Sequence, residues 1–206
     1  MNPRAGLLTV CVLAFTGCAG SLLDSNVEAP VTYRLEGEAL AERGGRLPLA
    51  IGVARLRSAP SLETERIAVL RPDSRFDYFT GVRWAEPATQ MLQQLLVRAL
   101  AADGRFEAVV AAPSRVPADL LLDVELRRFE AVYSTDGAAP TVRVEMQLAL
   151  IDPRKAQRVA SFVAAGSAAA AENRQDAVIA AFERATAEAV RAAAGQVREA
   201  APAASR

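Results

Sequence analysis

Two stretches of the chain place apolar residues at helical spacing. Residues 88–102 carry a Leu and Met face opposite a Gln and Arg face, and Asp103–Gly104 marks the end of this pattern. Pro87 suits the start of the helix, because the first turn does not need its N–H. A second, alanine-rich helix is expected after Asn173, with an inner stripe of Val178, Ile179, Phe182, Ala185, Ala189, Val190, Ala193 and Val197. Residues 201–206 are expected to form a frayed tail.

Alternation of apolar and polar residues predicts strands in most of the remaining chain. A long strand begins near residue 118, and its apolar positions shift by one residue at Arg127–Arg128, which predicts a β-bulge there. Return strands at residues 142–150 and 159–164 complete a meander. Shorter strands are expected at residues 31–35, 49–53, 66–70 and 106–111. This order favours an α+β fold, with a mixed, largely antiparallel sheet and two main helices packed on one face.

The segment 76–87 precedes the first helix and holds four aromatic side chains in a chain that is only 5% aromatic. Such a cluster is either an aromatic plug beneath a helix or an edge that faces a partner or lipid. We assign its two halves different roles. Trp84 and Pro87 are expected to act as a structural anchor at the helix start, while Tyr78 and Phe79 lie on an edge or loop and form a candidate partner surface.

Composition excludes several classes of function. The chain of 206 residues is 51% apolar, which suits one domain with a single core. Lys and Arg number 24, as do Asp and Glu, so a basic stripe for nucleic acid is not indicated. The absence of His removes Ser-His-Asp and Cys-His arrangements and the usual zinc ligands. We therefore expect no catalytic residue, no metal site and no cofactor apart from a covalent lipid.

The polar face of the expected sheet offers one enzyme alternative. Asp123 and Glu125 share a strand face and could act as paired carboxylates. Alternating acidic and basic residues are more often a solvated surface, or one that meets another subunit. The basic pairs Arg127–Arg128 and Arg154–Lys155 could meet lipid phosphates, although ordinary loop and bulge charges explain them as well.

The N-terminus has the features of an export signal that ends in a lipidation site. A short, positively charged start precedes an apolar run at residues 5–15, which is too short for a stable membrane span. The following Phe15-Thr16-Gly17-Cys18 resembles the bacterial lipobox, with Phe15 in place of the usual Leu. We expect a signal peptide at residues 1–17 and a lipid on Cys18. An ordinary secretory signal with an incidental Cys is the alternative.

The chain after Cys18 is expected to form a tether and then one domain. Residues 20–30 are small and polar, and fully extended they could reach on the order of 35 Å. We therefore assign a tether to residues 18–30 and a single α+β domain to residues 31–200. Ala19 follows the lipidated Cys in place of Asp, so the resemblance to lipoproteins implies the periplasmic face of the outer membrane.

Several of these features, taken in chain order, resemble the ABC-type transport auxiliary lipoprotein family, whose PqiC-like members are associated with MCE-type intermembrane transport. The resemblance covers nearly all of the chain after the signal peptide. Its marks are Cys18, Tyr33-x-Leu35, Arg66-Ile67-Ala68-Val69, Trp84-Ala85-Glu86-Pro87, Ala118-Asp119-Leu120, Phe129-Glu130 and the alanine-rich final helix.

The resemblance implies a non-catalytic outer-membrane lipoprotein that serves a transport system for lipid or another hydrophobic substrate. Its implied partners are an MCE-type protein and the inner-membrane permease and ATPase of that system. A homo-oligomeric ring is also implied, because PqiC-like members can form one. The alternative is an outer-membrane lipoprotein that scaffolds or activates other envelope machinery, such as cell-wall synthesis.

Overall fold

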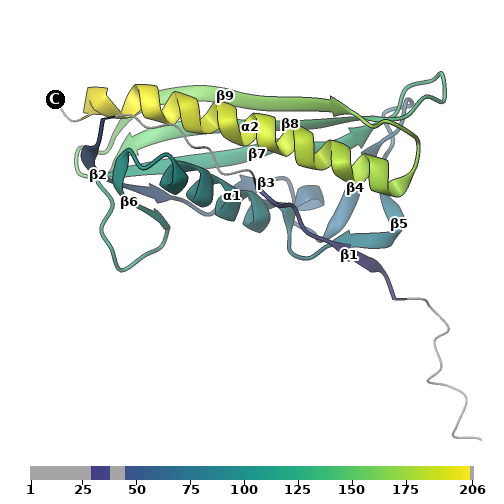
Figure 1. Ribbon diagram of the computed structural model, residues 1–206, viewed down its shortest axis with the longest axis horizontal. Coiled ribbons are helices and arrows are strands. Elements are labelled where there is room, and N and C mark those ends of the chain that lie inside the picture. Colours follow the sequence, from purple (N-terminus) through teal and green to yellow (C-terminus); the bar gives the residue numbers. More distant parts are fainter. Residues whose placement is uncertain (1–28, 38–44, 205–206) are drawn as a thin grey trace, which may run out of the picture.

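A curved sheet packs around two helices (Figure 1). The computed structural model describes residues 29–37 and 45–204, so the expected signal peptide, Cys18 and most of the tether lie outside the described residues. The elements are β1 (Val31–Tyr33), β2 (Leu47–Val53), β3 (Arg57–Ser58), a 3₁₀ turn (Pro60–Leu62), β4 (Arg66–Leu70), β5 (Phe76–Trp84), α1 (Ala88–Ala102), β6 (Phe106–Ala111), β7 (Leu120–Val132), β8 (Thr141–Asp152), β9 (Gln157–Ala169) and α2 (Gln175–Ala204).

Strand β7 organises the sheet, because it is paired along both of its edges. On one edge β8 runs antiparallel to it, and β9 runs antiparallel to β8. On the other edge β2, β3 and β4 pair in turn with the start, the middle and the end of β7, all in parallel. β6 continues the sheet beyond β2, and β5 and then β1 continue it beyond β4.

The strand directions correct one expectation from the sequence. Among the described residues, five of the eight strand pairings are parallel and three are antiparallel. The sheet is α+β and mixed as expected, but the description "largely antiparallel" fits only β7–β8–β9 and the β4–β5 pair. The physical reason is that the chain from β2 to β4 runs along one edge of β7 in the same direction as β7. The three short strands β2, β3 and β4 therefore each pair with β7 in parallel.

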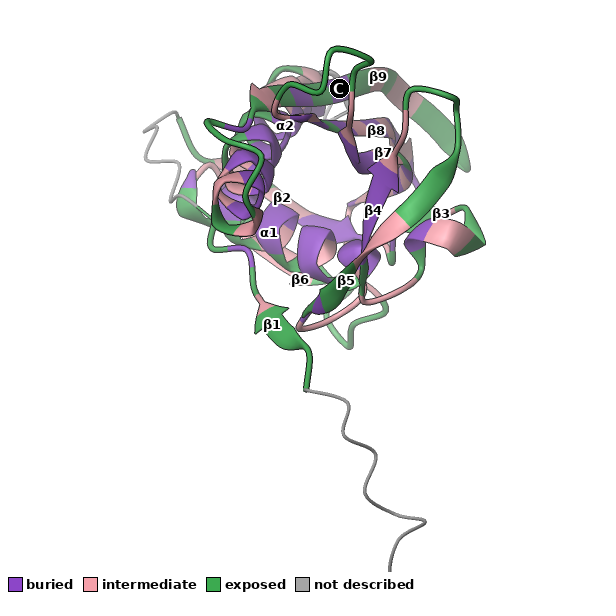
Figure 2. Ribbon diagram, turned by 90° about the vertical axis from the view of Figure 1, so that its right-hand side faces the viewer, coloured by how far each residue is buried: buried purple, intermediate pink, exposed green. Residues whose placement is uncertain are grey.

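The core lies between the inner face of the sheet and the two helices. Inward positions on β7 are the even-numbered residues up to Leu126 and the odd-numbered residues from Phe129, and a register shift between Leu126 and Arg128 separates the two sets. The predicted bulge is therefore confirmed. Figure 2 shows the buried residues of sheet and helices lining one common interior.

Both helices match the predicted amphipathic stripes. α1 begins and ends at the expected residues, with Asp103 at its C-cap and Gly104 in the left-handed region at φ 65°. Every member of the predicted inner stripe of α2 is buried. The second helix is longer than predicted, however: it continues through Pro202 to Ala204, and Ala201 is fully buried where a frayed tail was expected.

Side chains of α2 cover the outer edge of β9. The guanidinium of Arg184 donates to the oxygen of Ala169 at 2.8 Å, and the carboxylate of Glu188 accepts from the N–H of Ser167 at 2.9 Å. The amide of Gln196 donates to the oxygen of Val163 at 3.3 Å. A sheet edge normally exposes unpaired main-chain groups that can recruit another strand. Here the helix that packs against β9 satisfies three of those groups.

The register of the sheet defines two ends of the domain. One row joins Phe76, Leu70, Val132, Thr141 and Ala169. β1 runs parallel to β5 and pairs only with its last three residues, so the chain enters β1 from the side of this row, which we call the tether end. The far end carries the starts of β2, β6 and β7 and the β8–β9 turn, and α2 runs from the tether end to the far end (Figure 1).

Candidate partner surface

The aromatic segment forms strand β5, half of which lies at an edge of the sheet. β1 pairs only with Val82 to Trp84, so among the described residues no strand pairs with the outer edge of Phe76 to Gly81. On the inner edge, Tyr78 lies opposite Ala68. The register shift that follows places Phe79, Thr80, Gly81 and Val82 opposite Ile67 alone. The candidate residues thus lie on an edge strand with a large bulge.

The bulge needs a glycine at one position. Gly81 has φ 73°, in the left-handed region that residues with a β-carbon rarely adopt. Thr80 and Gly81 are exposed, while Phe79 is half-buried and packs against the core. Phe79 therefore presents only part of its ring to a partner.

Several contacts fix the position of the Tyr78 side chain. Its hydroxyl donates to the oxygen of Ser61 at 3.0 Å. The guanidinium carbon of Arg66 lies 3.8 Å from the centroid of the Tyr78 ring, and the ring of Phe76 meets it edge-on with centroids 5.5 Å apart. Phe76 is 41% exposed. We call Arg66, Phe76, Tyr78 and Phe79 the β5 edge surface.

Arg66 and Phe76 are the members of this surface that sequence reasoning left out, and Phe76 could have been found. The signal that could have found it is its position two residues before Tyr78, since alternate residues of a strand share a face. An arginine stacked on an aromatic ring beside a second, exposed ring is a composition common at protein interfaces. The structure therefore brings Tyr78 together with an arginine and another aromatic residue, while Phe79 follows in the bulge.

Trp84 and Pro87 lie away from this surface. Trp84 is completely buried, with its ring centroid 5.7 Å from that of Phe129 and 5.1 Å from that of Phe182. Its indole Nε1 is buried without a hydrogen-bond partner. The oxygen of Pro87 accepts from the N–H groups of Gln90 and Met91 at the start of α1. The buried Trp84 has no surface to offer a partner, whereas Pro87 is partly exposed, and the role of both residues as a structural anchor stays a prediction.

Two carboxylates of the polar sheet face, Asp123 and Glu130, are engaged in structural contacts. Asp123 forms an ion pair with Arg57 of β3 at 2.9 Å, and this hydrogen bond raises the pKa of the Arg57 guanidinium. Arg128 in the bulge pairs with the nearly buried Glu130 at 2.8 Å. In the part of the chain that the structure describes, no group of three His, Cys, Asp or Glu residues could hold a metal ion. No helix of residues 29–37 and 45–204 is long and apolar enough to cross a membrane.

A shallow groove of about 240 Å³ lies beside this bulge, between the polar sheet face and α2. Arg128 and Arg143 line it together with Glu145 and Glu188. Charges of both signs alternate there, and Glu188 is already bound to Ser167 of β9. The groove therefore does not favour a ligand of one charge.

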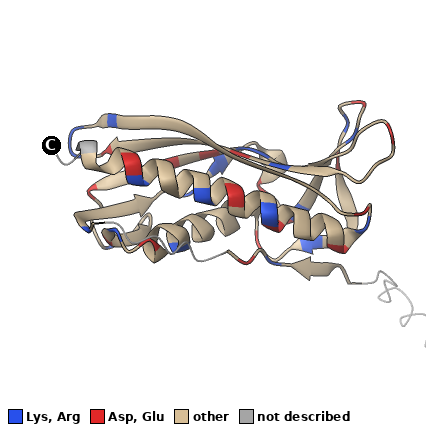
Figure 3. Ribbon diagram, turned by 45° about the horizontal axis from the view of Figure 1, so that its top comes forward, with Lys and Arg blue, Asp and Glu red and all other residues tan. Residues whose placement is uncertain are grey.

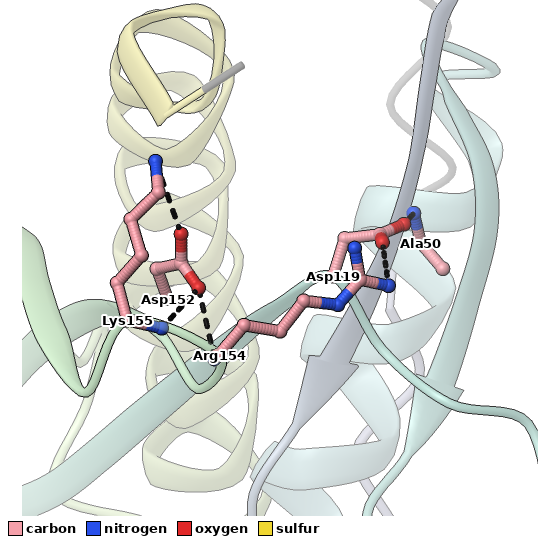
Figure 4. A network of polar contacts seen from close by, with 5 residues as sticks. All are labelled: Ala50, Asp119, Asp152, Arg154 and Lys155. Atoms are coloured by element: carbon pink, nitrogen blue, oxygen red, sulfur yellow. Dashed lines mark hydrogen bonds and ion pairs between the residues drawn. The ribbon is translucent and has the colours of Figure 1, made fainter. Parts of the chain in front are cut away.

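The two basic residues of the β8–β9 turn are also paired (Figure 4). Asp119 accepts from the N–H of Ala50 at 2.9 Å and from the guanidinium of Arg154 at 2.7 Å. Asp152 accepts from the N–H groups of Lys155 and Arg154, and its carboxylate lies 3.6 Å from the Lys155 ammonium. The N–H of Lys155 is the main cause that lowers the pKa of Asp152. Asp119 thus ties the turn to β2 and to the start of β7, while Asp152 stabilises the turn itself.

Comparison with known proteins places these features in a family. Residues 33–194 match the protein family described as "ABC-type transport auxiliary lipoprotein component". No curated protein matches the chain.

Solved structures share the fold. Protein XCC0632 from Xanthomonas campestris is 24% identical, with a TM-score of 0.76 over 85% of this chain and 99% of that one. The crystal structure of an uncharacterized protein is 19% identical, with a TM-score of 0.61 over 82% of this chain and 99% of the other. The PelC dodecamer from Paraburkholderia phytofirmans is 20% identical, with a TM-score of 0.38 over 75% and 89%. At these identities the first two similarities establish the fold and nothing further.

Proposed function

The chain belongs to the ABC-type transport auxiliary lipoprotein component family, and from this premise we propose that it is a non-catalytic docking module of an MCE-type envelope transport system. The observation that carries the proposal is the extent of the family match. It begins at Tyr33 in β1 and ends at Ala194 in α2, so it includes α1 and β2 to β9 in full. The proposed cargo is lipid or another hydrophobic molecule, and the proposed location is the periplasmic face of the outer membrane.

The proposed anchor is the lipid on Cys18. Each buried CH₂ of an acyl chain contributes about 0.8 kcal/mol to membrane binding, so more than one chain gives a stable attachment. The domain itself would then act by binding, through surfaces such as the β5 edge surface. A homo-oligomeric ring is part of the proposal, since a ring would present several copies of that surface to one partner.

The proposal is tested by asking what the full-length, membrane-bound protein contacts. After in-cell crosslinking and purification through a C-terminal tag, we expect to recover an MCE-type protein with its permease and ATPase. A Cys18→Ser variant is the matched control for the anchor: it should appear in the soluble periplasmic fraction, and mass spectrometry should find the acyl chains only on the wild-type N-terminus.

Two outcomes would contradict the proposal. Recovery of a cell-wall synthase without any transport component would favour the scaffold function instead. An unmodified Cys18, or cleavage at another position, would remove the lipid anchor and with it the proposed location.

A further inference from the structure

Figure 3 shows basic and acidic residues at both ends of the domain, and the described loops of the two ends differ in their balance. At the tether end, the segments 71–77, 133–140 and 170–176 contain three basic and five acidic residues. At the far end, the segments 45–46, 103–105, 112–119 and 152–158 contain six basic and three acidic residues. The chain as a whole has no net charge, so these loops differ in the distribution of charge and not because one sign is in excess overall.

Part of the positive charge at the far end is available to a partner. Arg115 in the β6–β7 loop and Arg158 at the start of β9 are exposed and form no ion pair with any described residue. Arg154 and Lys155 are paired with Asp119 and Asp152, yet their side chains remain 73% and 59% exposed. The acidic partners of these residues, Asp119 and Asp152, are only 28% and 12% exposed, so in these two pairs the basic side chain is the more accessible one.

An exposed apolar residue lies in the same loop as Arg115. Val116 is 49% exposed, and its N–H donates to the hydroxyl of Ser114 at 3.1 Å, which fixes the local turn. Two prolines, Pro113 and Pro117, flank these residues and restrict the loop further. Val116 and its neighbour Arg115 would offer a partner one apolar and one charged contact in the same loop.

We propose that the far end, with Arg115, Val116 and Arg158 among its exposed residues, is a docking surface for an acidic patch on a protein partner. This inference rests on the proposed function, because it concerns the transport component that the anchored domain meets. The chain enters β1 at the tether end, so a lipid on Cys18 would hold that end toward the membrane. The net negative charge there disfavours close contact with anionic headgroups, and the positive far end would face the periplasm.

Charge complementarity of this kind acts mainly on association rate and on specificity, and it is screened by salt. The experiment is capture of the transport components by full-length, membrane-extracted protein at two salt concentrations. The test variant is Arg115→Glu with Arg158→Glu, and a milder version is Arg115→Gln with Arg158→Gln. The matched control is Arg75→Glu at the tether end, where the arginine is 71% exposed.

We expect the charge-reversed double variant to bind the partner at least tenfold more weakly, the Gln variant to be intermediate, and the control to match wild type. Wild-type capture should fall as salt rises, and thermal melts should show that all variants fold. Equal capture by wild type and the double variant would overturn the docking surface and leave the proposed function intact. Wild-type protein that captures no transport component would overturn both.

A membrane surface is the competing target for a basic end. Vesicles of phosphatidylglycerol and phosphatidylcholine, mixed with the soluble Cys18→Ser protein, distinguish the two. No binding to these vesicles supports a protein partner. Vesicle binding that the double charge reversal abolishes, while capture of the partner is unchanged, would assign the far end to lipid and overturn the proposal.

Discussion

Gly166 of β9 lies so close to Ala185 of α2 that a β-carbon at position 166 would come within 2.0 Å of the main-chain oxygen of Ala185. The obstacle is helix backbone, which cannot rotate away as a side chain can. We expect Gly166→Ala to push α2 off the sheet and to lower the free energy of unfolding by about 1–3 kcal/mol or more.

Gly195 of α2 provides the matched control, because a β-carbon built there meets no atom within 4 Å other than its chain neighbours and the nearby backbone of its own helix. Gly195→Ala should raise stability by about 0.5–1 kcal/mol, since alanine is the better helix former. Urea denaturation of both variants measures the difference. Equal effects of the two substitutions would contradict the close approach of α2 and β9.

Trp84 joins β5 to both the sheet and α2 through its contacts with Phe129 and Phe182. Removal of a fully buried aromatic ring leaves a cavity, so Trp84→Ala should lower the free energy of unfolding by about 3–5 kcal/mol. Trp84→Phe should cost less, because part of the ring contact remains and the unpaired indole N–H is removed. Thermal and urea melts check the order, and a stable Trp84→Ala protein would refute the role of structural anchor.

The β5 edge surface leads to the opposite expectation. Tyr78→Ala and Phe79→Ala should weaken partner binding or oligomerisation more than they weaken folding, since both residues are only half-buried. Tyr78→Phe is the control: it keeps the ring over which Arg66 stacks and loses only the hydrogen bond to Ser61. Crosslinking yield and sedimentation, compared with melting temperature, separate the two effects. If these variants unfold more readily than Trp84→Ala, the division of the segment is wrong.

The pH dependence of stability follows from the groups whose pKa changes on folding. The N–H of Lys155 is the main cause that lowers the pKa of Asp152 in the folded protein below its usual value of about 3.9. The folded state therefore binds a proton at Asp152 less readily than the unfolded state does. The stabilising contribution of Asp152 is therefore complete above about pH 5 and is lost as pH falls through the lowered pKa. Burial raises the pKa of Tyr133, so its contribution is lost only as pH rises above about 10.

We accordingly expect a flat stability profile between about pH 5 and pH 9, because the chain contains no His to titrate there. Urea midpoints measured across this range provide the test, and Asp152→Asn should reduce the loss of stability in acid. A transition in the midpoint near pH 6 to 7 would be incompatible with this assignment.

The local pattern of apolar and polar residues was sufficient to predict elements whose bounds are determined by residues nearby in the chain. The bounds of α1 follow from Pro87, the apolar stripe and Gly104, and the bulge in β7 follows from the shift of alternation beside Arg128. The parallel pairing of β2, β3 and β4 with β7 joins residues some 60 positions or more apart, and no local spacing specifies it. The length of α2 was likewise underestimated, because the burial of Ala201 depends on tertiary packing that overrides the effect of Pro202.

The candidate surface was predictable only in part. The aromatic cluster can be recognised in the sequence. Which of its rings are buried and which are exposed, however, depends on the residues with which β5 pairs. Gly81 indicates a special backbone conformation, but the four-against-one bulge beside Ile67 requires the register of β4. The charge difference between the two ends is invisible in a neutral composition, since the loops that form each end come from distant parts of the chain.

The covering of β9 by Arg184, Glu188 and Gln196 has a consequence for biogenesis. Because β9 precedes α2 along the chain, a chain in which α2 is missing or has not yet folded presents an open strand edge. Such an edge is a site for pairing between chains. The domain therefore covers this edge only after its last element has folded, and its dependence on a chaperone that binds unfolded chains should be greatest for chains that end before α2.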